Sequence, residues 1–179
     1  CEYCYARRIA ERFGSNQMPI FTDYPALDKP VRSVGFDGEK IQPYPFDFTP
    51  TFHRYKLDTP HHWKKPRNIF VCSMADLFGE WVPDQWIEQI LEACDNASQH
   101  RYLFLTKNSD RYAYIDDLLP RHRRPPHVAE MWFGQSYTGI GDYRPITTSV
   151  MRQTFASIEP ILHSLTERDV VNIAATNDW

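Results

Sequence analysis

The sequence has little of several features that would place it in a special structural class. Only 4 of its 179 residues are cysteine and only 7 are glycine, and no signal peptide is visible. No apolar run approaches the roughly 20 residues that a membrane-spanning helix requires. These absences exclude a disulfide-dense scaffold and a glycine-rich low-complexity chain, and they predict no membrane partner. Because Cys72 and Cys94 lie in apolar settings typical of buried free thiols, we expect a reducing, cytoplasmic location.

A marked excess of charge is also missing. The formal net charge of −3 gives the chain as a whole no electrostatic reason to bind nucleic acid. The composition, 42% hydrophobic and 15% aromatic, is that of one globular domain with a real core. Two short basic runs, 61–67 and 121–127, stand out against this balance. They are either solvated loops or contacts for phosphate, with Trp63 available to stack on a base.

Proline sets the organisation of the first third of the chain. Residues 5–13 predict a short helix that ends at Gly14. Eight prolines then fall between residues 15 and 66, and they leave room only for short strands such as 51–57. We therefore expect a loop-rich insertion over 15–66 with one hairpin or two.

After Pro66, apolar runs alternate with helical patterns. The runs predict strands at 68–73, 101–106, 130–136 and 154–158. The patterns between them predict helices at 84–99, 109–119 and about 147–152, with Trp81, Trp86 and Trp132 packed in the core. Strands without a polar face favour a parallel sheet covered by helices, hence an α/β fold. Four units are too few for a closed eight-stranded barrel, so the sheet is either open or part of a (β/α) barrel.

Polar residues follow all four predicted strands. One such residue alone is ordinarily a helix cap or a turn. Parallel strands, however, end at the same edge of a sheet, so the four ends together predict a binding site at that edge. Its candidate residues are Ser73, Asp76, Thr106, Lys107, Ser136 and Glu159.

The chain opens with CEYCY, which places Cys1 and Cys4 three positions apart. A CxxC pair can hold a metal ion, an iron–sulfur cluster or a disulfide. A structural zinc would need two further ligands, and the candidate histidines lack the spacing of a zinc finger: His61, His62, His122 and His127. A thioredoxin-like redox pair would want a strand directly before the motif.

The opening motif resembles the last two cysteines of the radical S-adenosylmethionine signature CxxxCxΦC, in which an aromatic residue, here Tyr3, precedes the final cysteine. The blocks CEYCYARRIAERFG, WKKPRNIFVCSMADLFGEWVPDQWIEQI, RYLFLTKN, MWFGQSYT and FASIEPIL resemble successive blocks of a phage-borne radical-SAM-like family, functionally uncharacterised and related to spore photoproduct lyase. This resemblance covers most of residues 1–14 and 60–162. Its pattern has a third cysteine before Cys1, so we expect the chain to start within a cluster-binding loop, truncated at its N-terminus. Residues 163–179 depart from the pattern.

The resemblance implies one domain over residues 1–179, with β/α repeats over 67–162 forming a partial (β/α) barrel of radical-SAM type. It implies two cofactors, a [4Fe–4S] cluster held by Cys1 and Cys4 and S-adenosylmethionine on the iron that three thiolates leave open. Electron transfer then gives a 5′-deoxyadenosyl radical that abstracts hydrogen. Nucleic acid is the substrate class suggested by the relationship to a DNA-repair lyase.

Roles for the strand-end residues follow from the same resemblance. Tyr3 is expected near the adenine, and Ser73 and Asp76 near the methionyl or ribose groups. Lys107 is expected to meet a carboxylate or phosphate, and Glu159 a ribose hydroxyl or a substrate donor. Thr106 and Ser136 complete the cofactor-binding set. The alternative is a non-catalytic phage accessory or nucleic-acid-binding domain whose CxxC is metal-free or holds zinc.

Overall fold

The computed structural model describes residues 4–14, 23–36, 38–115, 129–138, 146, 153–158 and 165–178. The contacts within the chain define two compact units, Cys1–Thr59 and Pro60–Trp179. We expected one domain over 1–179 with an insertion at 15–66. Most of that proline-rich stretch lies in the first unit, and the single domain stays a prediction.

The first unit combines one helix with short paired strands. Helix α1 ends at Gly14, as its sequence predicts, and the expected hairpin is confirmed in β2 and β3. Strands β1 and β4 pair in parallel over two residues each. The bounds are α1 Tyr5–Phe13, β1 Ala26–Leu27, β2 Arg32–Gly35, β3 Gly38–Ile41, β4 Phe52–His53 and the 3-10 helix η1 Arg54–Lys56.

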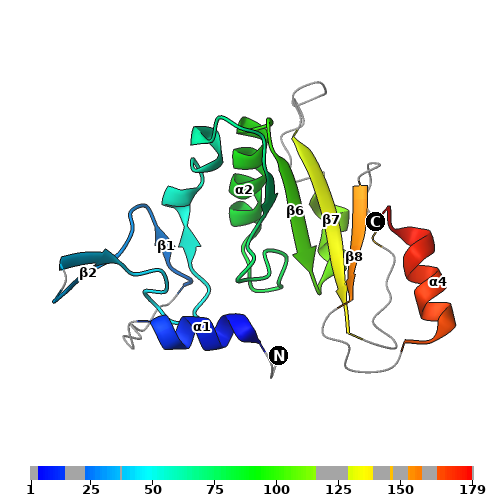
Figure 1. Cartoon of the computed structure of the whole chain (residues 1–179), viewed down its shortest axis with the longest axis horizontal. Helices are drawn as coiled ribbons and strands as arrows, with labels where there is room; N and C mark the ends of the chain where they lie inside the picture. Colours follow the sequence, from blue (N-terminus) through cyan, green and yellow to red (C-terminus); the bar gives the residue numbers. More distant parts are fainter. Residues whose placement is uncertain are drawn as a thin grey trace. The chain divides into compact units, whose positions relative to one another are not determined.

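The second unit is built on a four-stranded parallel sheet in which the strands follow one another in chain order (Figure 1). The strands are β5 Asn68–Phe70, β6 Arg101–Thr106, β7 Glu130–Tyr137 and β8 Gln153–Ile158. The helices are η2 Pro60–His62, α2 Asp84–Asn96, η3 Ser109–Tyr114 and α4 Glu167–Thr176. The α/β class and the parallel sheet are confirmed, and the described strands form an open sheet rather than a closed barrel.

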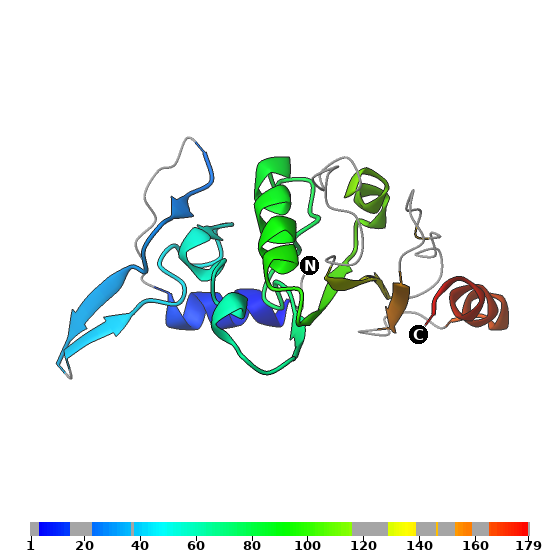
Figure 2. The ribbon, with the colours of Figure 1, turned by 90° about the horizontal axis from the view of Figure 1, so that it is seen from above.

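One face of this sheet carries the core. Side chains alternate along a strand, and the register pairs Phe104 on β6 with Phe133 on β7. Their rings stack with centroids 5.2 Å apart, and both lie in one buried cluster with residues of α2 and η3. Figure 2 shows α2 and η3 on the same side of the sheet. The two helices that the structure describes between the strands, α2 and η3, therefore cover the same face.

The register places a second set of side chains on the other face, which we call the second face. It carries Leu103, Leu105, Trp132, Gly134, Ser136, Phe155 and Ser157. At its centre, Phe155 pairs across strands with Gly134, and the aromatic ring packs over the glycine. A β-carbon on Gly134 would lie 2.3 Å from Cζ of Phe155, so only glycine fits there without moving a buried ring.

Two expected elements differ in the structure. The helix predicted at 109–119 is a 3-10 helix over Ser109–Tyr114, and residues 116–119 lie outside the described part. The helix predicted at about 147–152 also lies outside it. Helix α4 was not expected, although a capping box between Thr166 and Asp169 marks its start. Across the described ranges, no helix has the length and apolarity to span a membrane.

Substitution of Gly134 by alanine tests the packing at the centre of the second face. We expect Gly134→Ala to lower the free energy of unfolding by about 1–3 kcal/mol, because the Phe155 ring must leave its position. Urea denaturation measures the change. Gly35→Ala is the matched control, since its added β-carbon would meet only the Gly38 carbonyl oxygen at 3.8 Å. Equal stability of the two variants would contradict this account.

Candidate functional site

The candidate site lies at the carboxyl ends of β5 and β6, where the segment 71–83 joins β5 to α2. The chain leaves β5 through a turn in which Cys72 has a φ of 56°, a left-handed conformation uncommon for a residue other than glycine. The carbonyl oxygen of Cys72 accepts a hydrogen bond of 2.9 Å from the N–H of Ala75, which closes this turn. The turn sends the following residues toward the end of β6.

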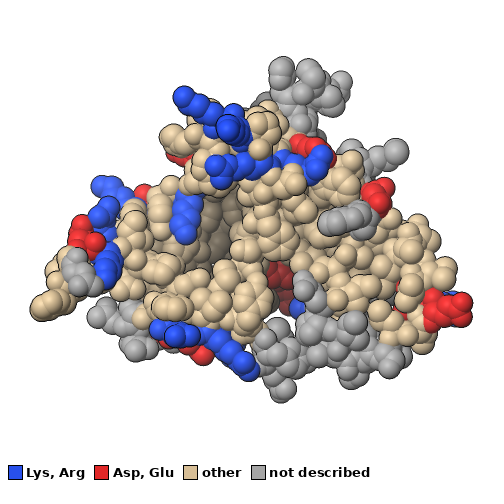
Figure 3. Space-filling model, in the orientation of Figure 1, with Lys and Arg blue, Asp and Glu red and all other residues tan. Residues whose placement is uncertain are grey.

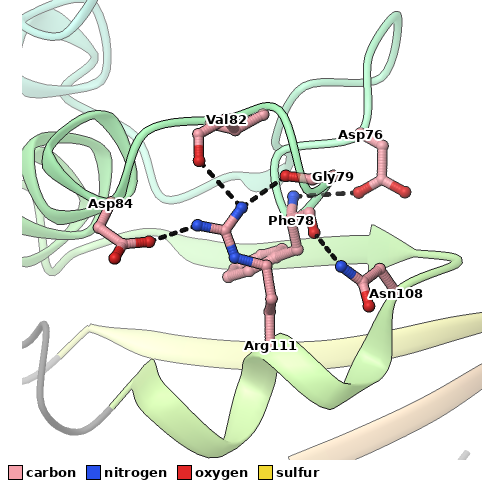
Figure 4. Close-up of polar contacts among 7 residues, drawn as sticks. All are labelled: Asp76, Phe78, Gly79, Val82, Asp84, Asn108 and Arg111. Atoms are coloured by element: carbon pink, nitrogen blue, oxygen red, sulfur yellow. Dashed lines mark hydrogen bonds and ion pairs between the residues drawn. The ribbon is translucent and has the colours of Figure 1, made fainter.

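The carboxylate of Asp76 joins this segment to the residue after β6. Figure 4 draws its other bond, to Phe78. One oxygen accepts the backbone N–H of Phe78 at 3.0 Å, and the other accepts the backbone N–H of Lys107 at 3.0 Å. Lys107 is the first residue after β6. Asp76 therefore holds the ends of two neighbouring strands together, and its role in the structure is to position them.

Phe78 anchors the segment from inside the core. Its side chain is 1% exposed, and its ring packs edge-on against Phe104 and Tyr112, with centroids 6.0 and 4.7 Å apart. The amide of Asn108 donates to the Phe78 carbonyl oxygen at 2.9 Å. Both backbone polar groups of Phe78 are thus paired with side chains, as burial of this residue requires.

Arg111 on η3 fixes the second half of the segment (Figure 4). Its guanidinium donates to the carbonyl oxygens of Gly79 and Val82, the latter at 2.9 Å, and it forms an ion pair with Asp84 at the start of α2. A β-carbon at Gly79 would lie 2.5 Å from the ring of Trp81, so a larger residue there would displace that ring. Segment 71–83 is therefore held at several points despite having no regular structure.

The structure brings together some of the predicted strand-end residues and separates others. Ser136 lies on the second face. Lys107 follows Thr106 just as Ser136 follows Gln135, and Thr106 and Gln135 are the last pair of the β6–β7 ladder, so both residues stand at the carboxyl end of that ladder. Thr106 points to the covered face instead, where it is 1% exposed and its hydroxyl accepts the N–H of Asn108 at 2.9 Å. Ser73 is exposed on the segment after β5. The polar edge near the second face is formed by Lys107, Ser136 and the carboxylate of Asp76 with its two backbone bonds, which we call the clasp.

The predicted cluster ligands are only partly within the described structure. Cys4 lies in the first unit, at the position directly before α1, and its thiol is free and half-buried. Cys1, Tyr3 and Glu159 lie outside the described residues. In the ranges that are described, no three or more histidine, cysteine, aspartate or glutamate side chains come together as a metal site.

Sequence reasoning missed three residues of this region. Asn108 and Arg111 act on segment 71–83 across about thirty positions of sequence, and no local pattern signals such bonds. Trp81, expected in the core, is 51% exposed and lies over Gly79. Its neighbours Phe78 and Val82 supply the buried contacts that the sequence pattern suggested for it.

The two remaining described cysteines are protonated thiols. Burial raises the pKa of Cys72 to about 11, and the nearby Asp76 carboxylate acts in the same direction. Burial raises the pKa of Cys94 even further. These thiols are poor nucleophiles at neutral pH, and the expectation that they are structural agrees with their packing against the core.

A family model described as "Protein of unknown function (DUF5131)" matches residues 1–179. The chain belongs to this family. Neither a curated protein nor a solved structure matches the chain at a significant level. The family's description names no activity, so a function must be argued from the residues themselves.

In this family member, replacing Asp76 by alanine should loosen the contact between β5 and β6. The N–H groups of Phe78 and Lys107 lose their acceptor, and we expect a loss of about 1–3 kcal/mol in the free energy of unfolding. Hydrogen exchange should accelerate at these two amides more than at the centre of β6. Glu80→Ala, an exposed acidic position on the same segment, is the control and should change neither quantity. Unchanged exchange at Lys107 in Asp76→Ala would refute the clasp.

The raised pKa of Cys72 predicts how stability depends on pH. Its thiol ionises near pH 9 in the unfolded chain but only near pH 11 in the folded one, so the unfolded state releases its proton first. The free energy of unfolding should therefore be at its full value below pH 9. It should fall as pH rises toward 11, by at most about 1.4 kcal/mol per pH unit for one thiol. Urea denaturation between pH 8 and 10.5 measures this slope, which should be shallower in Cys72→Ser. Identical slopes in both proteins would disprove the assignment.

Proposed function

We propose that this protein is a radical S-adenosylmethionine protein that binds a [4Fe–4S] cluster through Cys1, Cys4 and a third cysteine, with nucleic acid as the substrate class that the resemblance suggests. The observation that carries the proposal is the form of the sheet. Its four parallel strands follow chain order, and the described helices between them cover one face. A doubly wound fold has helices on both faces, whereas a segment of a (β/α) barrel has them on the outer face alone.

In such a barrel segment, the second face corresponds to the interior, and ligands bind at the carboxyl ends of the strands. Ser136 lies on that face, and Lys107 directly follows β6 at the same edge. An ammonium group and a hydroxyl suit the carboxylate and ribose oxygens of S-adenosylmethionine, so the donor set fits this ligand. Asp76 would hold the edge in place by its two backbone bonds rather than by reaching the ligand.

The cysteine motif supports the cluster. The thiol of Cys4 is free and lies directly before the first turn of α1, where the unpaired backbone N–H groups of a helix favour negative charge. When bound, the cluster and S-adenosylmethionine would supply one-electron chemistry that starts with hydrogen abstraction. The protein's share is to hold both cofactors, orient the substrate and exclude competing reactions.

Anaerobic reconstitution of the protein expressed from its full reading frame tests this proposal. We expect about four iron and four sulfide per chain, and an EPR signal of the reduced cluster that changes when S-adenosylmethionine is added. Cys4→Ala should lose the iron because the cluster loses a ligand. Cys72→Ala is the matched control and should keep it, since burial and a raised pKa make Cys72 a poor ligand.

A further variant separates the two cofactors. Lys107→Ala should bind iron like the unmodified protein but need more S-adenosylmethionine to change the EPR signal. Stoichiometric zinc in place of iron, or full iron content in Cys4→Ala, would overturn the proposal.

A further inference from the structure

The basic run 61–67 lies at the edge of the sheet opposite to the candidate site. It directly precedes β5, so it belongs to the amino-terminal edge, whereas the candidate site is at the carboxyl ends. The run is separate from the groups assigned above to the cofactors. A role for it therefore stands whether or not the proposed function holds.

A buried histidine fixes both ends of this run. His100 is 2% exposed and precedes β6. Its Nδ1 accepts the backbone N–H of Arg67 at 3.1 Å, which leaves Nε2 to carry the hydrogen and donate to the carbonyl oxygen of Pro60 at 2.8 Å. The Arg67 carbonyl oxygen in turn accepts the N–H of Arg101 at 2.9 Å. The loop is therefore held as a defined arch rather than as a loose solvated segment.

Within the arch, an aromatic ring and a cation form a pair. The guanidinium carbon of Arg67 lies 4.5 Å from the centroid of the Trp63 ring. The Trp63 ring also meets the His100 imidazole edge-on at 6.0 Å, and the Trp63 carbonyl oxygen accepts a bond from Gln99 at 3.3 Å. Trp63 remains half-buried and Arg67 remains exposed. These contacts preorganise a flat surface of the kind on which nucleic-acid bases stack.

Two lysines at the top of the arch complete the surface. Lys64 and Lys65 are exposed, and no carboxylate in the described part of the chain forms an ion pair with either. Arg101, by contrast, is neutralised by Glu130 at 2.6 Å. Figure 3 shows lysine and arginine side chains gathered above the amino-terminal ends of the strands. Among the described residues at this edge, the arch therefore supplies positive charge that no described carboxylate pairs with.

We propose that the arch formed by residues 60–67 binds single-stranded nucleic acid. Lys64 and Lys65 would contact backbone phosphates, and a base would stack on the pair formed by Trp63 and Arg67. Cations beside a partly exposed aromatic ring suit single strands, because the bases of a single strand are unpaired and can stack on the ring. A duplex would offer only its phosphates to the lysines. An acidic protein would offer no base to stack on the pair formed by Trp63 and Arg67. The small number of cations predicts a modest affinity with a shallow dependence on salt.

Fluorescence anisotropy with labelled poly(dT) and poly(U) of about 20 nucleotides tests this proposal at several salt concentrations. We expect both probes to bind, with and without reconstitution of the cluster. Lys64→Ala/Lys65→Ala should bind about tenfold more weakly, and its slope of log affinity against log salt should be shallower by about 1.4, because two phosphate contacts are lost. Lys29→Ala/Lys40→Ala removes the same charge from exposed lysines of the first unit and is the matched control.

A third variant tests the aromatic pair. Trp63→Ala should weaken binding at least about fivefold while leaving the salt slope unchanged, since stacking involves no release of ions. Circular dichroism verifies that it folds, and the double lysine variant tests the arch independently of it. Three results would overturn the proposal: equal binding by the two double lysine variants, heparin binding as tight as oligonucleotide binding with no effect of Trp63→Ala, or preference for a duplex of the same length.

Discussion

The structure of the second unit depends on satisfying the backbone of one irregular segment, residues 71–83. Because Phe78 is buried in the core, its N–H and carbonyl oxygen must find partners away from water. Asp76 and Asn108 supply them, and Arg111 does the same for Gly79 and Val82. Apart from the local bond between Phe78 and Asp76, these bonds connect the chain after β5 with the chain after β6, as does the bond from the Lys107 N–H to Asp76. The carboxyl edge is consequently a rigid part of the fold, and Lys107 is placed on a fixed backbone.

This constraint also explains the tight geometry of η3. Arg111 must reach back to segment 71–83, and the hydroxyl of Tyr112 must donate to the Gly134 carbonyl oxygen at 2.8 Å. These tertiary contacts hold residues 109–114 as a 3-10 helix, although the apolar spacing alone predicts an ordinary helix. Local propensity is weak, and tertiary bonds of this kind override it.

The strands and helices that the sequence predicts well are those that follow from the spacing of its apolar residues. β6 coincides with its predicted range, and α2 begins at the predicted Asp84, because continuous burial and helical spacing are visible in any single stretch. The capping box of Thr166 and Asp169 was equally visible and was overlooked. The hydrogen bonds of Arg111, by contrast, join segments that are far apart in the sequence, so no local pattern indicates them. Within the candidate site, the sequence identified the residues that follow the parallel strands, and a binding site there stays a prediction. The sequence could not show that Thr106 faces the core, where this residue is 1% exposed, because that depends on the register of the sheet.

The register of β6 connects the two ends of the sheet. His100, just before the strand, holds the arch at the amino-terminal edge, and Lys107, just after it, receives the bond from Asp76 at the carboxyl edge. A shift of one residue would turn Phe104 out of the core and break both bonds at once. Three interactions therefore fix the register of β6 against β5: the burial of Phe104 and one side-chain hydrogen bond at each end of the strand. For this reason a three-residue strand such as β5 can carry a defined surface at both of its ends.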